Sequence, residues 1–144
     1  MNTPLFLDSN LIMYSLGAPH PLKEPCQKIL EKIGSEEIHS ITNIEVLQEI
    51  LHRYFSIGKP DIAEIAYSSV IKLCVAILPV TLRETDLALE LMKEIPSVTS
   101  RDAIHAATMM NNGIKEIIST DNHFDLMRRV RRIDPRKFRL GMEG

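Results

Sequence analysis

The stretch TPLFLDSNLIMYSL, residues 3–16, contains the pattern that decides the fold. Residues 3–7 form a short apolar run that ends at Asp8, and residues 10–16 continue with apolar side chains at helical spacing. This pattern predicts a β-strand that leads directly into an α-helix, with Ser9 placed to cap the helix. In a parallel sheet, ligands bind beyond the carboxyl ends of the strands, so Asp8 stands at a position suited to a functional group.

The same alternation of strand and helix continues along the chain. Further strands are predicted at residues 37–41, 75–80, 116–119 and 130–133. Helices are predicted at residues 24–33, 44–54, 61–73, 82–92 and 101–111, the last of them capped by Ser100. Such alternation indicates a three-layer α/β/α sandwich with a central, mostly parallel sheet. No repeat or linker interrupts the pattern, so residues 1–144 are expected to form a single domain.

The composition is typical of a protein that folds around its own hydrophobic core. At 144 residues and 44% hydrophobic content, the chain can bury a core without disulfides or a structural metal. Its two cysteines, Cys26 and Cys74, lie far apart and form no CxxC pair, which suits a reducing compartment. The sequence has neither an apolar run of the roughly 20 residues that a membrane span requires nor a signal peptide at its start. We therefore expect a cytoplasmic protein with no membrane partner.

Charge is unevenly distributed along the chain. The formal net charge is −2, yet residues 128–144 contain seven of the 17 Lys and Arg residues and only two acids. Clustered arginines can bind phosphates by displacing counterions, so the basic C-terminal segment, residues 128–139, is a candidate nucleic-acid contact. Within it we single out Arg128, Arg129 and Arg131. A solvated terminus that balances an acidic body is an equally weighted alternative.

Acidic residues occupy several positions suited to a metal site. Asp8 and Asp121 follow predicted strands, Asp102 lies in the first turn of a helix, and Glu45 and Glu49 share one helical face. Carboxylates that meet in one cleft repel by about 4 kcal/mol per pair at 4 Å and an effective dielectric near 20. A bound cation removes this repulsion. Oxygen ligands favour Mg²⁺ or Mn²⁺, and such ions promote the hydrolysis of phosphodiesters.

Two segments of the sequence resemble a known family. FLDSNLIMY (residues 6–14) and SRDAIHAATMMNNGIKEIISTDNHFD (residues 100–125) are similar to the metal-binding segments of PIN domains, and more narrowly of prokaryotic VapC-type toxins. The resemblance covers nearly the whole chain and implies an endoribonuclease that uses Mg²⁺ or Mn²⁺. It also implies an RNA substrate, a homodimer and, for a toxin, an antitoxin protein that blocks the cleft. The metal-binding and catalytic acids that it assigns are Asp8, Glu49, Asp102 and Asp121.

The resemblance gives supporting roles to three further residues. Asn10 stands where a polar side chain commonly supports the site. The segment TNIEVLQEILHRY (residues 42–54) contains two candidates for the helical acid. We favour Glu49, which completes a VLxE pattern, as the metal ligand. Glu45 would then support the site without binding the metal, or the two roles would be reversed. Asp125 either joins the metal site through water or caps the following loop.

Two other classes of protein deserve comparison with this interpretation. The Glu49-to-His52 and Asp102-to-His105 spacings occur in di-iron helical bundles, but prolines and glycines divide this chain into short segments that include strands. We therefore expect packing or supporting roles for His52 and His105. The second alternative is a PIN-like module that binds RNA or protein without cutting, and the intact set of four acids argues against it. The sequence contains no GxxxxGK or GxGxxG motif and no Ser-His-Asp elbow.

Overall fold

The computed structural model describes residues 3–138, in which five strands form one parallel sheet. The strands are β1 (Leu5–Leu7), β2 (Ser40–Asn43), β3 (Cys74–Leu78), β4 (Glu116–Ile118) and β5 (Arg131–Ile133). Their order across the sheet is β3-β2-β1-β4-β5, so β1 lies at the centre. Because all neighbouring pairs are parallel, the carboxyl ends of the strands meet at one edge of the sheet.

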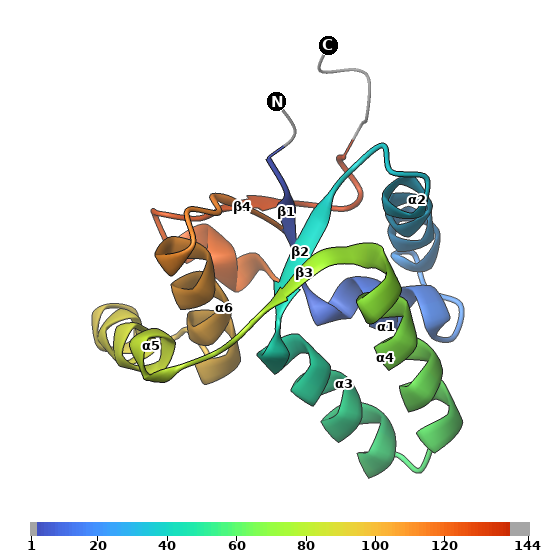
Figure 1. Cartoon of the computed structure of the whole chain (residues 1–144), viewed down its shortest axis with the longest axis horizontal. Coiled ribbons are helices and arrows are strands. Elements are labelled where there is room, and N and C mark those ends of the chain that lie inside the picture. The colour runs from blue at the N-terminus through green and yellow to red at the C-terminus, as the bar shows by residue number, and fades with distance from the viewer. Residues whose placement is uncertain (1–2, 139–144) are drawn as a thin grey trace.

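Helices cover both faces of this sheet and produce the predicted α/β/α sandwich. Within residues 3–138 they are α1 (Ser9–Leu16), α2 (Lys23–Gly34), α3 (Ile44–Ser56), α4 (Pro60–Leu73), α5 (Leu82–Glu94), α6 (Ser100–Asn111) and the short 3-10 helix η1 (Asn122–Leu126). Figure 1 shows α5 and α6 on one side of the sheet and α1, α2 and α4 on the other. Helix α3 begins directly at the end of β2 and packs beside α4. No helix among the described residues is long and apolar enough to cross a membrane.

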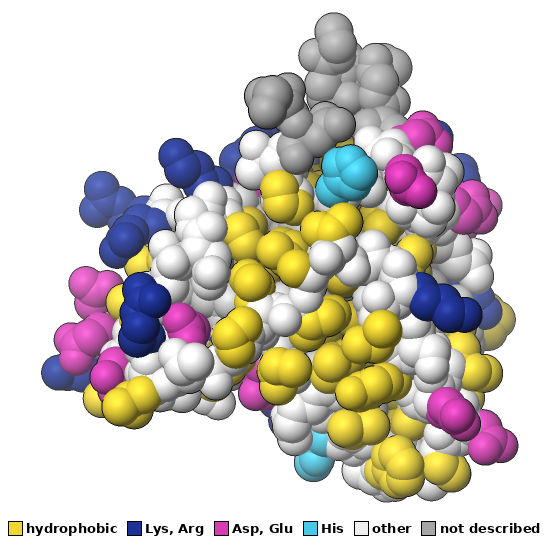
Figure 2. Space-filling view, in the orientation of Figure 1, with side chains coloured by type: hydrophobic (Ala, Val, Ile, Leu, Met, Phe, Trp, Pro, Cys, Tyr) yellow, Lys and Arg dark blue, Asp and Glu magenta, His cyan; other side chains and the backbone are white. Residues whose placement is uncertain are grey.

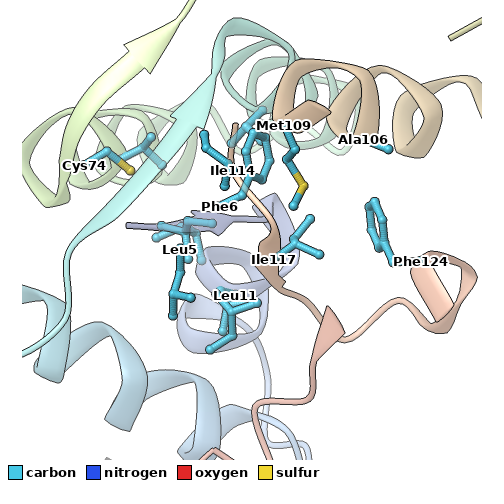
Figure 3. Close-up of a cluster of buried hydrophobic side chains, with 14 of the residues drawn as sticks. Leu5, Phe6, Leu11, Cys74, Ala106, Met109, Ile114, Ile117 and Phe124 are labelled. Carbon is cyan, nitrogen blue, oxygen red and sulfur yellow. The ribbon is translucent and has the colours of Figure 1, made fainter. Parts of the chain in front are cut away.

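The central strands are buried between these layers. Phe6 of β1 and Ile117 of β4 have no exposed surface. Figure 3 shows Leu11 of α1 on one side of this part of the sheet and Met109 of α6 on the other. Burying one such side chain contributes about 1.5–3 kcal/mol. This packing therefore fixes the end of β1 and, with it, the position of Asp8.

The structure corrects two details of the predicted elements. Strand β2 begins at Ser40, because the polar side chains that suggested a boundary are bonded inside the protein; Thr42 Oγ1, for example, donates to the Leu7 carbonyl at 2.8 Å. The helix caps lie one residue earlier than predicted. Asp8 caps α1 and Thr99 caps α6, since their extended backbones turn the side chains toward the first free amides. Arg139, the last residue of the basic C-terminal segment, lies outside the described residues.

Candidate functional site

Asp8 is buried at the carboxyl end of β1, where hydrogen bonds hold both of its carboxylate oxygens. Oδ1 accepts from the backbone N–H of Ser9 at 2.7 Å. Oδ2 accepts from Ser119 Oγ at 2.6 Å and from Asn10 Nδ2 at 3.2 Å. Burial raises the pKa of Asp8, and this effect outweighs the opposing influence of His105 and the hydrogen bonds. The carboxylate is thus firmly oriented but costly to ionise without a cation.

Asn10 and Ser119 connect the carboxyl ends of the two central strands. The Asn10 amide donates to Ser119 Oγ at 3.2 Å, and its carbonyl oxygen accepts from the Thr120 N–H at the same distance. Ser119 Oγ also accepts from the backbone N–H of Asp121 at 2.9 Å. Asn10, whose supporting role stays a prediction, thus bonds both Asp8 and the Ser119–Thr120 segment. Ser119 was not identified from the sequence, although it touches both Asp8 and the loop of Asp121.

Glu49 of α3 and His105 of α6 complete a first cluster with Asp8. His105 Nε2 lies 2.9 Å from Glu49 Oε1 and 3.8 Å from Asp8 Oδ1, and the three ligand atoms lie within 4.8 Å of one another. Burial lowers the pKa of His105, but the carboxylates of Glu49 and Asp8 have the larger combined effect. The pKa of His105 therefore lies above its ordinary value. The sequence predicted only a packing or supporting role for His105. Its three-residue spacing from Asp102 on α6 could have indicated that both face the site.

Asp102 and Asp121 form a second cluster with His123. His123 Nδ1 lies 2.8 Å from Asp121 Oδ1 and 3.8 Å from Asp102 Oδ2. Burial and the adjacent Asp121 carboxylate raise the pKa of Asp102 to about 8. Asp8 contributes a smaller part of this rise, as expected if the two clusters lie near each other. Burial also raises the pKa of Asp121, but the interaction with Asp102 and the hydrogen bonds with His123 lower it below its ordinary value. His123 was not singled out from the sequence.

These residues fit a hard divalent cation. The buried Asp102 Oδ2 has no hydrogen-bond partner among residues 3–138, and a buried carboxylate oxygen without one is costly. A cation would supply the missing partner and would relieve the repulsion between the acids. The two clusters bring together the four acids assigned by the resemblance, which come from four parts of the chain: Asp8, Glu49, Asp102 and Asp121.

Two acids with proposed secondary roles belong to neither cluster. Glu45 is half-buried one turn before Glu49, and burial together with the Glu49 charge raises its pKa. Asp125 instead forms a bidentate pair with Arg132, at 3.0 and 3.1 Å, and so connects η1 to β5. The structure thus gives Asp125 a partner other than the metal site.

The arginines chosen as nucleic-acid contacts lie on another part of the molecule. Arg131 begins β5 and is paired in register with Glu116, the first residue of β4. Arg128 and Arg129 precede it. All three therefore lie toward the amino edge of the parallel sheet, opposite the edge that holds Asp8. Their contact with nucleic acid stays a prediction, and a nucleic acid bound there would lie away from the acidic clusters.

The fold and the site together define an α/β protein with carboxylates gathered at one edge of a parallel sheet. The chain belongs to the PIN domain family, whose model matches residues 5–130. A VapC ribonuclease of Mycobacterium bovis is 33% identical over 129 residues, which cover 90% of this chain and 98% of that protein.

Solved structures agree with this fold. VapC20 of Mycobacterium tuberculosis, described as a sarcin-ricin loop cleaving toxin, matches with a TM-score of 0.71 at 19% identity, over 88% of this chain and 96% of that one. A chain of a toxin-antitoxin complex from Klebsiella pneumoniae matches with a TM-score of 0.64 at 14% identity, over 91% and 97%. At these identities the likeness concerns the fold.

Proposed function

We propose that the protein is an endoribonuclease that hydrolyses RNA phosphodiester bonds with Mg²⁺ or Mn²⁺, and that it is the toxin of a toxin-antitoxin pair. The observation that carries this proposal is the gathering of four acids in two clusters at one edge of the sheet, one of which contains a buried oxygen, Asp102 Oδ2, that has no partner among the described residues. The 33% identity with a protein named VapC ribonuclease, over nearly its whole length, supports RNA as the substrate. We assign the activity to a single domain, residues 1–144, that acts in the cytoplasm.

The residues of the chain divide the work of such a site. Asp8, Glu49 and Asp102 would hold the principal ion, and Asp121 would complete the site or hold a second ion. The bound ion would supply Lewis-acid catalysis by stabilising charge on the reacting oxygens. Ser119 holds the Asp8 carboxylate in place, since its hydroxyl donates to Oδ2 at 2.6 Å.

Two protein partners complete the proposal. One is an antitoxin that covers the acidic clusters, in keeping with the likeness to a chain of the Klebsiella pneumoniae toxin-antitoxin complex. The other is a second copy of this chain. Figure 2 shows hydrophobic side chains gathered over β3 and the neighbouring α3 and α4. In this apolar face, Val75 is 64% exposed, Ile71 is 47% exposed, and β3 is an edge strand of the sheet.

A cleavage assay tests the activity. Purified protein is incubated with mixed RNA in Mg²⁺, in Mn²⁺ or in a chelator, beside Asp8→Asn and the control Asp86→Asn on the exposed surface of α5. We expect metal-dependent cleavage by the wild type and the control, and a loss on the order of 100-fold or more for Asp8→Asn. Cleavage in the chelator, or full activity of Asp8→Asn, would contradict the proposal. RNA binding without any cleavage would favour the non-catalytic module.

A further inference from the structure

A buried series of hydrogen bonds behind the acidic clusters fixes the orientation of the Asn43 amide. Asn43 ends β2 and caps α3, and its Oδ1 accepts from the Val46 N–H at 3.1 Å. The amide nitrogen therefore faces α6, where Nδ2 donates to Thr108 Oγ1 at 2.9 Å and lies 3.2 Å from His105 Nδ1. The Thr108 hydroxyl gives its own proton to the Ile104 carbonyl at 2.8 Å, so its oxygen is free to accept.

This orientation determines where the His105 ring carries its proton. His105 Nδ1 faces an amide group that has only protons to offer, so Nδ1 must be an acceptor. A neutral imidazole carries one N–H, which is then on Nε2, and Nε2 donates to Glu49 Oε1 at 2.9 Å. A doubly protonated ring would direct an N–H at the protons of the Asn43 amide, so this contact opposes the charged form that Glu49 and Asp8 favour. In either form Nε2 carries a proton and donates to Glu49. Asn43, Thr108 and His105 have no exposed surface, so bulk water does not compete for these bonds.

By distance alone, His105 Nε2 could be a metal ligand together with Asp8 and Glu49. A histidine that binds a metal offers an unprotonated nitrogen, and its other ring nitrogen usually donates to a carboxylate or a carbonyl. The Asn43 amide imposes the reverse arrangement. We infer that Asn43 holds His105 as a hydrogen-bond donor that positions Glu49, and so keeps the site all-oxygen, the ligand set that suits Mg²⁺ or Mn²⁺, without the imidazole nitrogen that would favour Zn²⁺. The inference rests on the proposed function in assuming a cation at the acids.

The tautomer can be observed directly in the full-length protein. Long-range ¹H–¹⁵N NMR correlations show which ring nitrogen of each histidine is protonated, and the spectrum of His105→Gln identifies the His105 signals. We expect the proton on Nε2 in a chelator and also in saturating Mg²⁺. A proton on Nδ1, or loss of the Nε2 proton when Mg²⁺ binds, would overturn the inference.

A single substitution should shift the metal preference toward Zn²⁺. In Asn43→Asp the carboxylate still accepts from the Val46 N–H and can also accept from His105 Nδ1, which moves the ring proton to Nδ1 and frees Nε2 as a ligand. Calorimetry on protein without an affinity tag gives the Kd for Mn²⁺ and for Zn²⁺. We expect the Zn²⁺ preference, Kd(Mn²⁺)/Kd(Zn²⁺), to rise by about 10-fold to 100-fold. The double variant Asn43→Asp/His105→Gln has the same added charge and should lose this rise.

These measurements separate the inference from the function on which it rests. A wild type that binds neither Mg²⁺ nor Mn²⁺ contradicts the proposed function. A wild type that binds Mn²⁺ while Asn43→Asp leaves the Zn²⁺ preference unchanged contradicts the inference alone. If Asn43→Asp does not fold, the NMR measurement on the wild type still decides.

Discussion

The buried carboxylates of the site differ in the partners of their oxygens. Asp8 accepts hydrogen bonds from Ser9, Ser119 and Asn10, so the site is built to hold it. Asp102 Oδ2 has no such bond among the described residues, although its helix is capped normally by Thr99. Replacing the Asp102 carboxylate should therefore remove few stabilising contacts from the metal-free protein. The cost of burying this carboxylate beside other acids would be removed as well.

We predict that Asp102→Asn stabilises the metal-free protein. The substitution removes a buried carboxylate that burial and Asp121 make costly to ionise, and we expect urea unfolding in a chelator at pH 7.5 to show a gain of about 1–3 kcal/mol. Mn²⁺ should raise the melting temperature of the wild type and of the Asp86→Asn control. It should raise the melting temperature of Asp102→Asn much less. A less stable Asp102→Asn protein would instead indicate a structural aspartate.

The sequence predicts the acids of the site better than the residues that orient the site through hydrogen bonds. Asp8 and Asp121 could be identified because each follows a strand, and such positions share one edge of a parallel sheet. Ser119 and Asn43 could not, because each acts on a side chain far away in the sequence: Ser119 bonds Asp8 and Asn43 bonds His105. Contacts of this kind depend on side-chain geometry that no local pattern encodes.

Glu84 joins helix α5 to helix α6. It forms a capping box with Thr81 at the start of α5, and its Oε2 accepts from Asn111 Nδ2, at the end of α6, at 2.7 Å. Burial raises the pKa of Glu84, but the hydrogen bonds from Asn111 and Thr81 outweigh it and lower the pKa to about 2. The ionised form therefore stabilises the fold.

We predict that Glu84→Gln destabilises the protein in a pH-dependent way. A carboxyl whose pKa is lower in the folded state contributes stability above its unfolded pKa of about 4.3, and this is lost as the pH falls toward the folded value. Urea unfolding should show a loss of about 1–2 kcal/mol at pH 7 that shrinks between pH 5 and pH 3. Glu90→Gln, on the exposed face of the same helix, is the control. An equal loss at every pH would show that the charge is unimportant.

The helices follow from the sequence more closely than the strands. Helix α4 was predicted at residues 61–73 and observed at Pro60–Leu73, because proline at its start and apolar spacing within it are local features. Strand β2 was placed about three residues too early. Its buried Ser40 and Thr42 look like loop residues until their partners, Leu73 and Leu7 on other elements, are known.

The order of the strands across the sheet cannot be predicted from the alternation of strands and helices along the chain. That alternation predicts a parallel sheet, but several orders satisfy it, and the observed β3-β2-β1-β4-β5 order places β3 at one edge. The same order brings the ends of β1, β2 and β4 together around the acidic clusters. The free edge at β3 continues into the apolar face seen in Figure 2.

We predict that this apolar face joins two copies of the chain. Light scattering should give about twice the 16.3 kDa chain mass for the wild type. Val75→Glu places a charge at an exposed position of β3, within this face, and should yield monomers. Leu89→Glu is the matched control, because Leu89 is similarly exposed, at 58%, but lies on α5 on the other side of the molecule. A monomeric wild type, or dissociation by Leu89→Glu alone, would contradict this assignment.

Anomalous diffraction from crystals of the protein soaked in Mn²⁺ would locate the bound ion. If the four acids meet to hold a hard dication, the strongest peak will lie between Asp8, Glu49 and Asp102, with carboxylate oxygens about 2.0–2.3 Å away, and it will vanish in Asp8→Asn. A peak only at some other place, or none near these oxygens at saturating Mn²⁺, would contradict a metal site at the four acids.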